Sequence, residues 1–404
     1  MNLEDLLRET LDGMAHEEEP PPAARFLSRL PKAAKRPSRV IPLVTAAAVV
    51  VLVIVSTLVI QQLSPRDSRP PEPADSARPV PVEKLWPGAV HSLPKKLRNG
   101  LSFRPQLFVD TRTLLVSTGK GNSADPVVLW TYDVASGRAS RLLAPRPPAK
   151  TDYTSSVVTG SGRLVWYTVS WGKVKGALDI WAAPVGGGAA KRVTTIRQTM
   201  KYGDIDVLAV VGDKVVWSRG HEGGIYEAPL SGGEPRSVPG TERLHLLQWP
   251  WAARGTRLGE DPTDSLPSFE RLVNVLTGEE RTASERASAC SLTWCLNREP
   301  RESRARRRDG SADHLLPGGF LWPAPPALDR FVLLRPRGQV DAEGRLYLHD
   351  LATRRTGDLG VRFKYGSKAS ADIMNATRLD YGTAYLLTYS LKDRQMVVNL
   401  TAIR

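Results

Sequence analysis

The stretch 40–60 contains no charged residue, no amide side chain and no glycine. At about 1.5 Å per residue, a helix of this length spans roughly 31 Å, which matches the ~30 Å hydrocarbon core of a bilayer. A buried helix of a soluble protein normally shows a polar stripe, and this stretch has none. The pattern therefore predicts a transmembrane helix over residues 40–60.

Charges differ on the two sides of this predicted span. Directly before it, the stretch 25–39 holds six bases and no acid (Arg25, Arg29, Lys32, Lys35, Arg36 and Arg39), whereas acids and bases are mixed after it. Because Lys and Arg gather at cytoplasmic ends of spans, we expect a cytoplasmic N-terminus and an extracytoplasmic C-terminal part. A cleaved signal peptide is the alternative, but the long lead and the lack of an Ala-x-Ala motif favour an uncleaved signal anchor. The sequence predicts a single-pass protein of the cell membrane.

The predicted cytoplasmic tail, residues 1–39, begins with an amphipathic pattern over 2–17. Its apolar residues recur at spacings of three and four and share one helical face: Leu3, Leu6, Leu7, Leu11 and Met14. A lone helix this short is marginal in water, and the surrounding acids disfavour an anionic membrane surface. We expect a cytoplasmic protein partner to bind this face. A fraying helix without a partner is the alternative.

Proline dominates the predicted linker, residues 61–87, which reads as a polyproline-type spacer. At about 3.1 Å per residue it reaches at most roughly 70 Å. We therefore expect the linker to hold the rest of the chain, residues 88–404, near the membrane.

From residue 88 onward the pattern changes to short β-forming segments joined by glycine-bearing turns. Six segments each predict a strand, a turn and a second strand: 129–143, 179–194, 224–238, 271–282, 307–316 and 345–359. Most are preceded by a further strand candidate, at 113–117, 163–170, 214–218, 330–335 and 385–389. Four short strands in every ~40–50 residues are typical of a propeller blade.

The two ends of this region indicate how the ring would close. The stretch 89–93 is a strand candidate without a local partner, and the last hairpin ends at 396–400 with no strand after it. If residues 89–93 complete the last blade, the all-β domain is a seven-bladed β-propeller without exposed sheet edges. A six-bladed ring is the alternative, and a two-sheet sandwich is a third, less favoured arrangement.

The net charge of +14 lies entirely in the predicted outer domain, because the tail and the linker each hold equal numbers of acids and bases. A charge excess outside the membrane argues against nucleic acid as a partner and favours anionic lipid, a wall polymer or an acidic protein. A merely solvated basic surface is the alternative. One run is unusually basic and is a candidate patch for an anionic partner: Arg298, Arg301, Arg304, Arg306, Arg307 and Arg308.

Few residues of the sequence indicate covalent bonding, metal binding or catalysis. Cys290 and Cys295, the two cysteines of the chain, are spaced for a disulfide that closes a small hairpin, with two reduced thiols as the alternative. No histidine pair has metal-ligand spacing, and no nucleophile elbow, phosphate loop or dinucleotide motif is present. We therefore expect no cofactor, metal or catalytic residue. Four tryptophans of the middle region fit blade cores better than a channel mouth: Trp249, Trp251, Trp294 and Trp322.

The hairpins of the type Ile-Trp-x-x-x-Val-x-Gly-Gly-x-x-Lys-Arg-Val, seen at 180–193, resemble the repeats of TolB-like propellers and, more distantly, of WD-repeat proteins. The layout resembles bacterial, actinobacterial-type membrane-anchored proteins with a short cytoplasmic helix, one span and an outer propeller. Together these features predict a binding scaffold or sensor, linked to a cytoplasmic partner through the tail. The alternatives are a propeller hydrolase or lyase acting on an anionic envelope polysaccharide, and an envelope-assembly component like the TolB-like relatives.

Overall fold

The computed structural model describes residues 79–120, 127–143, 153–155, 157–170, 176–197, 205–220, 223–254, 268–298, 302–321, 324–336, 343–364 and 386–404. The chain divides into two units, residues 1–72 and 73–404, and the described ranges belong to the second. The predicted tail helix with Leu3, Leu6, Leu7, Leu11 and Met14, the span 40–60 and most of the linker lie outside these ranges and stay predictions. Among the helices within the described ranges, none has the length and apolar character needed to cross a bilayer.

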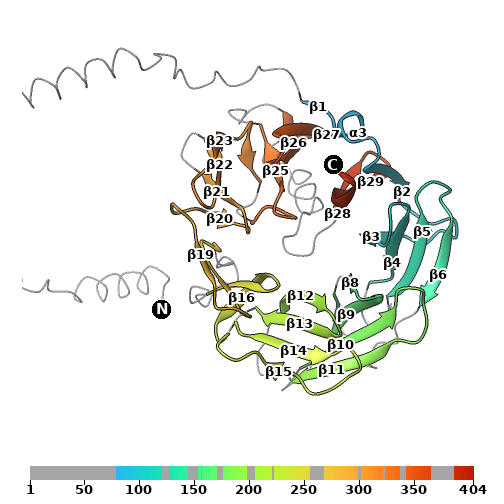
Figure 1. Ribbon diagram of the computed structural model, residues 1–404. Helices are drawn as coiled ribbons and strands as arrows, with labels where there is room; N and C mark the ends of the chain where they lie inside the picture. Colours follow the sequence, from blue (N-terminus) through green and yellow to red (C-terminus); the bar gives the residue numbers. More distant parts are fainter. Residues whose placement is uncertain are drawn as a thin grey trace, which may run out of the picture. The chain divides into compact units, whose positions relative to one another are not determined.

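Seven sheets, which we number as blades 1 to 7, form a ring (Figure 1). Blade 1 contains β3 (Phe103–Phe108), β4 (Thr113–Thr118), β5 (Val128–Asp133) and β6 (Ala139–Leu143). Blade 2 contains β7 (Tyr153–Thr154), β8 (Val158–Gly160), β9 (Arg163–Ser170), β10 (Ala177–Pro184) and β11 (Lys191–Arg197). Blade 3 contains β12 (Ile205–Val211), β13 (Lys214–Arg219), β14 (Ile225–Pro229) and β15 (Arg236–Ser237). Blade 4 contains β16 (Leu244–Gln248), β17 (Trp251–Arg254), β18 (Arg271–Asn274) and β19 (Glu280–Thr282).

Of the remaining blades, blades 6 and 7 combine segments from the start and the end of the described chain. Blade 5 contains β20 (Ala289–Cys290), β21 (Trp294–Arg298), β22 (Ser303–Arg307) and β23 (Asp313–Leu315). Blade 6 contains β24 (Gly319–Phe320), β25 (Phe331–Arg335), β26 (Glu343–Asp350) and β27 (Arg355–Lys364), with β1 (Val80–Pro81) added in parallel at its outer edge. Blade 7 contains β28 (Leu386–Leu391), β29 (Arg394–Asn399) and β2 (Val90–Pro94). A short helix, α3 (Val82–Leu85), joins β1 to β2, and a 3-10 turn, η2 (Leu400–Ala402), follows β29.

The ring closes by pairing the start of the domain with its end. Strand β2 is antiparallel to β29, with Val90 opposite Val398 and Pro94 opposite Arg394. The amide of Asn399 donates to the carbonyl of Ala89 at 2.8 Å and extends this pairing. The seven-bladed prediction is therefore confirmed, and the six-bladed ring and the two-sheet sandwich are wrong. Closure satisfies the edge of the last blade, which would otherwise offer unpaired backbone groups.

The predicted hairpins are confirmed, and their turns explain why the pattern recurs. In blade 1 the carboxylate of Asp133 accepts from the amides of Ala135 and Ser136, and Gly137 follows with φ 68°. In blade 4 the side-chain oxygen of Asn274 accepts in the same way from the next turn, and Gly278 has φ 73°. An Asx residue four positions before a glycine thus reverses the chain, because the glycine takes the left-handed conformation without strain.

Apolar side chains pack between neighbouring blades, so the core is divided around the ring. Between blades 2 and 3, for example, Val165 and Leu178 pack with Leu208 and Trp217, and each is buried. Trp251 belongs to the core of blade 4 beside the disulfide, and Trp294 belongs to the core shared by blades 5 and 6. Trp249 packs at the edge of the core shared by blades 3 and 4. The described tryptophans of the middle group are therefore core residues, and Trp322 lies outside the described residues.

Candidate functional site

The first candidate site is a polar group on the inner strands. Asp206 of β12 accepts from Nδ1 of His245 of β16 at 2.6 Å and from Oγ of Ser218 at 3.2 Å. The Ser218 oxygen also accepts from the amide of Leu246 at 3.1 Å. The exposed fractions of the His245 and Asp206 side chains are 5% and 6%. These buried hydrogen bonds therefore join blade 3 to blade 4, and they satisfy the polar atoms that take part in them.

This arrangement does not activate the serine. In a nucleophilic triad the histidine receives the proton of the hydroxyl, and the carboxylate orients the histidine from its other side. Here Asp206 stands between the other two, so that Ser218 and His245 both point to the same carboxylate. Within the described inner strands β3, β8, β12, β16, β20 and β24, Asp206 is the sole carboxylate. In the same ranges no three His, Cys, Asp or Glu side chains gather as metal ligands.

A second candidate is the arginine run of blade 5, which the sequence singled out. Arg304 and Arg306 share the carboxylate of Asp313, at 3.0 and 3.1 Å. Arg304 also pairs with Glu302 at 3.1 Å, and Arg306 pairs with Glu285. Desolvation, the largest single influence, raises the pKa of Asp313, but the hydrogen bonds and charges of the two guanidiniums together outweigh it and keep this pKa below its usual value. The charges of Arg304 and Arg306 are thus largely neutralised within the blade.

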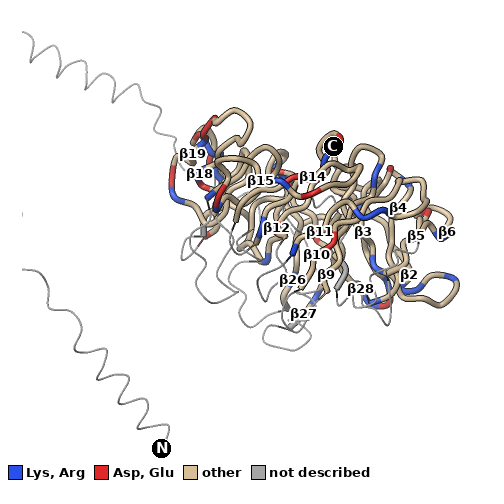
Figure 2. Tube along the Cα trace, turned by 90° about the horizontal axis from the view of Figure 1, so that it is seen from below, with Lys and Arg blue, Asp and Glu red and all other residues tan. Residues whose placement is uncertain are grey.

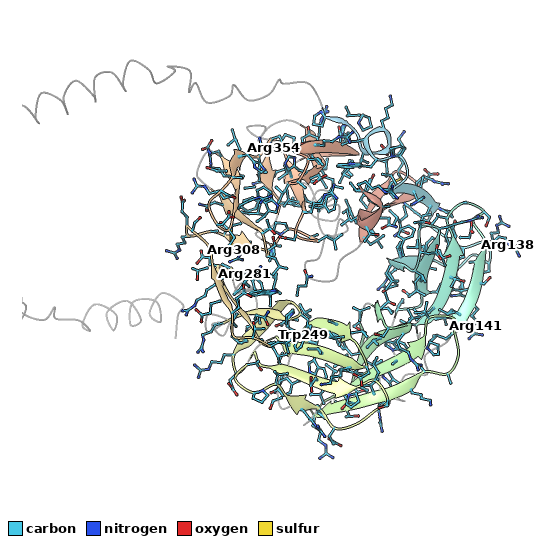
Figure 3. All side chains as sticks on the ribbon, in the orientation of Figure 1. Arg138, Arg141, Trp249, Arg281, Arg308 and Arg354 are labelled. Atoms are coloured by element: carbon cyan, nitrogen blue, oxygen red, sulfur yellow. A yellow bond between two sulfur atoms is a disulfide. The ribbon has the colours of Figure 1, made fainter. Side chains whose placement is uncertain are left out.

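Arg308 has a different role from the one predicted for it, because it is buried. Its guanidinium donates to four backbone carbonyls, those of Phe269, Glu270, Ser291 and Leu292, at 2.5–3.2 Å. Burial lowers its pKa to about 10. Figure 3 shows Arg308 inside the ring wall between blades 4 and 5. Arg308 therefore joins two blades and contributes nothing to an exposed patch.

The rest of the run adds little free charge. Arg307 is exposed and lies over the ring of Trp294, 5.5 Å from its centroid. The side chain of Arg298 and all of Arg301 lie outside what the structure describes. A small hollow beside these strands is lined by Glu285, Arg286, Asn297, Arg306 and Arg307 among others. Its walls carry the ion pairs already described, so binding of an anionic partner by this run stays a prediction.

The two cysteines form a disulfide next to this hollow. The S–S distance is 2.04 Å and the two Cα atoms are 4.0 Å apart. Cys290 lies on β20 and Cys295 directly opposite on β21, and both are buried. The bond therefore closes the turn between the first two strands of blade 5, a position that stabilises the hairpin and leaves no thiol exposed there.

A pair of buried histidines lies between blades 5 and 6. The ring of His314 is 5.1 Å from that of Trp294 and 6.4 Å from that of His349. Neither ring nitrogen of His314 has a hydrogen-bond partner among the described residues, whereas Nδ1 of His349 pairs with the Thr356 hydroxyl at 2.8 Å. Burial lowers the pKa of His349 to about 4, and the pKa of His314 is lowered as well, mainly by burial. Both rings are therefore neutral at physiological pH.

The third candidate lies where the ring closes. We call it the seam surface and define it by six exposed cations: Lys95, Lys96, Arg98, Arg138, Lys392 and Arg394. None of the six forms an ion pair with another described residue, although Asp393 lies between two of them in the sequence. Figure 2 shows lysine and arginine positions in the turns beside β2 and β28, and Figure 3 places Arg138 on the outer edge of blade 1.

Backbone carbonyls hold three side chains of the seam surface in place. Lys95 Nζ donates to the carbonyl of Lys392 at 2.9 Å, and Arg98 donates to that of Ser136 at 3.0 Å. Arg394 donates to the carbonyl and the hydroxyl of Ser92 at 2.7 and 2.9 Å. These acceptors are neutral, so the cations are oriented but keep their charge. The surface thus combines blades 7 and 1 across the closure.

The seam surface was missed in the sequence because its parts are almost 300 positions apart. The run at 298–308 is dense along the chain and attracted the prediction instead. A signal did exist, since Lys-Lys-Leu-Arg at 95–98 follows the strand predicted to close the ring and Lys-Asp-Arg at 392–394 forms the last hairpin turn. Applying the predicted closure to the charges would have brought the two segments together.

No known protein family matches the sequence, and no curated protein matches it either. Solved structures with some likeness include prolyl oligopeptidase B from Galerina marginata, with 10% identity and a TM-score of 0.40, covering 72% of this chain and 47% of that one. Saccharomyces cerevisiae Sqt1 has 8% identity and a TM-score of 0.37, covering 73% of this chain and 83% of that one. The propeller domain of the trilobed protease from Pyrococcus furiosus has 11% identity and a TM-score of 0.35, covering 65% and 84%. At these values the propeller assignment rests on the seven sheets themselves.

Proposed function

We propose that this chain is a membrane-anchored binding module whose propeller acts outside the cytoplasm as a scaffold or sensor. The observation that supports this function best is the seam surface, a group of six exposed cations without ion pairs among the described residues. Three of them, Lys95, Arg98 and Arg394, are held by neutral carbonyls. Unpaired and oriented charge is what recognition of an anionic partner requires. The polar group on the inner strands, in contrast, is buried and already bonded within the fold.

The predicted span and tail complete the proposal. Residues 40–60 would anchor the chain, and the face formed by Leu3, Leu6, Leu7, Leu11 and Met14 would bind a cytoplasmic protein. The propeller and the tail would then respond to partners on opposite sides of one membrane. A polysaccharide hydrolase is less well supported, because glycoside hydrolysis generally uses two carboxylates and the described inner strands provide Asp206 alone.

Cross-linking capture in native membranes tests this function. The full chain is compared with a chain lacking residues 1–19 and with the L6S/L7S/L11S variant, each identified by its cross-linked partners. We expect a cytoplasmic protein to be captured by the full chain alone, and outer partners to be captured by all three. Identical capture by all three chains would remove the tail from the proposal, and the absence of specific partners on either side would overturn it.

A further inference from the structure

The seam surface concentrates charge at the point where the chain enters the propeller. Lys95, Lys96 and Arg98 follow directly after β2, the strand that closes the ring. Lys392 and Arg394 belong to the turn that pairs with the end of β2, with Pro94 opposite Arg394. Three of its six cations, Lys95, Lys96 and Arg98, therefore lie within 11 residues of the end of the predicted linker at residue 87.

An apolar residue lies within these cations. Residues 96–102 form a tight turn, in which Lys96 bridges to Ser102 and the amide of Leu97 donates to the carbonyl of Leu101 at 2.8 Å. Gly100 adopts φ 84°, which lets the chain reverse. Leu101 is 46% exposed, whereas Leu97 is buried in the core between blades 7 and 1. The turn thus holds one large apolar side chain outward among basic ones.

This combination has the chemistry of an anionic bilayer surface. Basic residues near such a surface each contribute on the order of 1 kcal/mol of attraction, and exposed apolar side chains add to it by entering the boundary between head groups and acyl chains. An acidic protein would match the cations, but it would not by itself explain the exposed leucine. Because β1 and α3 belong to the ring, only residues 61–79 of the predicted linker can extend, and at about 3.1 Å per residue they reach at most roughly 60 Å, which keeps the turn within range of the bilayer.

We propose that the seam surface docks the propeller on anionic lipid head groups, with Leu101 entering the interface. This inference rests on the proposed function in one respect, since it takes the span at 40–60 as the anchor. Docking would fix one orientation of the ring relative to the membrane. It would leave the hairpins of blades 3 to 5, on the other side of the ring from the seam (Figure 1), turned to other partners.

A single dye reports the docking directly. Because Cys290 and Cys295 are joined in the disulfide, a cysteine introduced by Leu101→Cys can be labelled selectively with a polarity-sensitive fluorophore. The labelled full chain is reconstituted in nanodiscs of phosphatidylcholine alone or of phosphatidylcholine with phosphatidylglycerol. The matched control is Leu276→Cys, since Leu276 is 66% exposed at the tip of the β18–β19 hairpin in blade 4.

We expect a blue shift at position 101 in anionic discs, none in neutral discs, and none at position 276 in either. Salt at 1 M should reverse the shift, because the screening length falls to about 3 Å. The K95A/K96A/R98A variant should lower the docking equilibrium constant roughly a hundredfold, at about fivefold for each cation. The R163A/K191A/R236A variant removes the same charge from exposed cations of blades 2 and 3 that have no ion pair with another described residue, and it should change this constant less than about twofold.

Other outcomes would overturn the inference. An equal shift in neutral discs, or equal losses in the two triple variants, would show that the seam surface has no specific role in lipid docking. A shift that appears only when a soluble acidic protein or an anionic polymer is added to neutral discs would assign the surface to that partner instead.

Failure of the anchor is distinguished by carbonate extraction of native membranes. If the chain is extracted, the membrane-anchored function fails. Sedimentation of the same full chain with anionic and neutral vesicles then still tests the seam surface on its own.

Discussion

Blade 5 and the closure seam are both rich in basic residues, but they use these residues in opposite ways. In blade 5, Arg304 and Arg306 are paired with acids and Arg308 is buried against four carbonyls. At the seam, Lys95, Arg98 and Arg394 bond only to neutral acceptors. The density of basic residues along a sequence is therefore a poor guide to free surface charge, because folding brings neutralising partners to them from other parts of the chain.

The largest effect should come from Arg308. In Arg308→Met, four buried carbonyls lose a charged donor, and we expect the free energy of unfolding to fall by at least about 3 kcal/mol. Thermal and denaturant unfolding of the detergent-solubilised chain measures this change. Arg307→Ala is the matched control, since Arg307 is exposed next to it and should cost less than about 1 kcal/mol. If both variants lost the same free energy of unfolding, the buried guanidinium of Arg308 would not stabilise the blade border as proposed.

Acid should loosen the border between blades 5 and 6. Burial lowers the pKa of His349 to about 4, so the unfolded chain takes up a proton at this residue first as the pH falls. Stability is therefore complete above pH ~6.5 and is lost as the pH falls from there towards 4, by about 3 kcal/mol for His349 alone. Unfolding measured at a series of pH values checks this slope.

The H314Q/H349Q variant is the control for the acid effect, since it removes both titrating rings from the border. Its absolute stability can differ from that of the parent, but its dependence on pH over this range should be much weaker. Hydrogen exchange should locate the loosening in β23, β25 and β26. An unchanged slope in the variant would assign the acid effect to other groups.

Reduction of the disulfide should have a smaller effect. The bond closes a turn of few residues, so the loop-closure term predicts a loss of about 2 kcal/mol in the C290S/C295S variant. Unfolding in the presence and absence of a reductant provides the same comparison without a mutation. A loss that exceeds that of Arg308→Met would show that the disulfide stabilises blade 5 more than the buried guanidinium does.

The smallest change in stability is expected for Asp313→Asn, a variant that directly tests the comparison between blade 5 and the seam. Asp313→Asn removes the carboxylate shared by Arg304 and Arg306, at a cost below about 1 kcal/mol because these pairs are partly exposed. Arg304 and Arg306 then keep only their pairs with Glu302 and Glu285, and retention on a cation exchanger should increase. Lys96→Ala should decrease it. If Asp313→Asn leaves retention unchanged, the two regions do not differ through ion pairing.

Much of the ring could be predicted because its signals are local. The turns at Asp133 and Asn274 recur as the same short pattern, and the unpaired strand at 89–93 identified the closure. The strands β17 and β21 were not predicted, since they lack clear alternation. The bonding of Arg308 could not be predicted, because its acceptors are carbonyls from blades 4 and 5 that carry no sequence signature.

Strand β1 and helix α3, which pack on blade 6, determine the order in which a pulling force would reach the parts of the ring. Any tension on the chain ahead of Val80 first reaches the parallel pairing of β1 with β27. It then reaches Val82 and Trp86, which pack so closely on Gly357 that a side chain there would meet both within 3.2 Å. A pulling force must therefore detach β1 and α3 from blade 6 before it reaches β2. The attachment thus protects the β2–β29 pairing that closes the propeller.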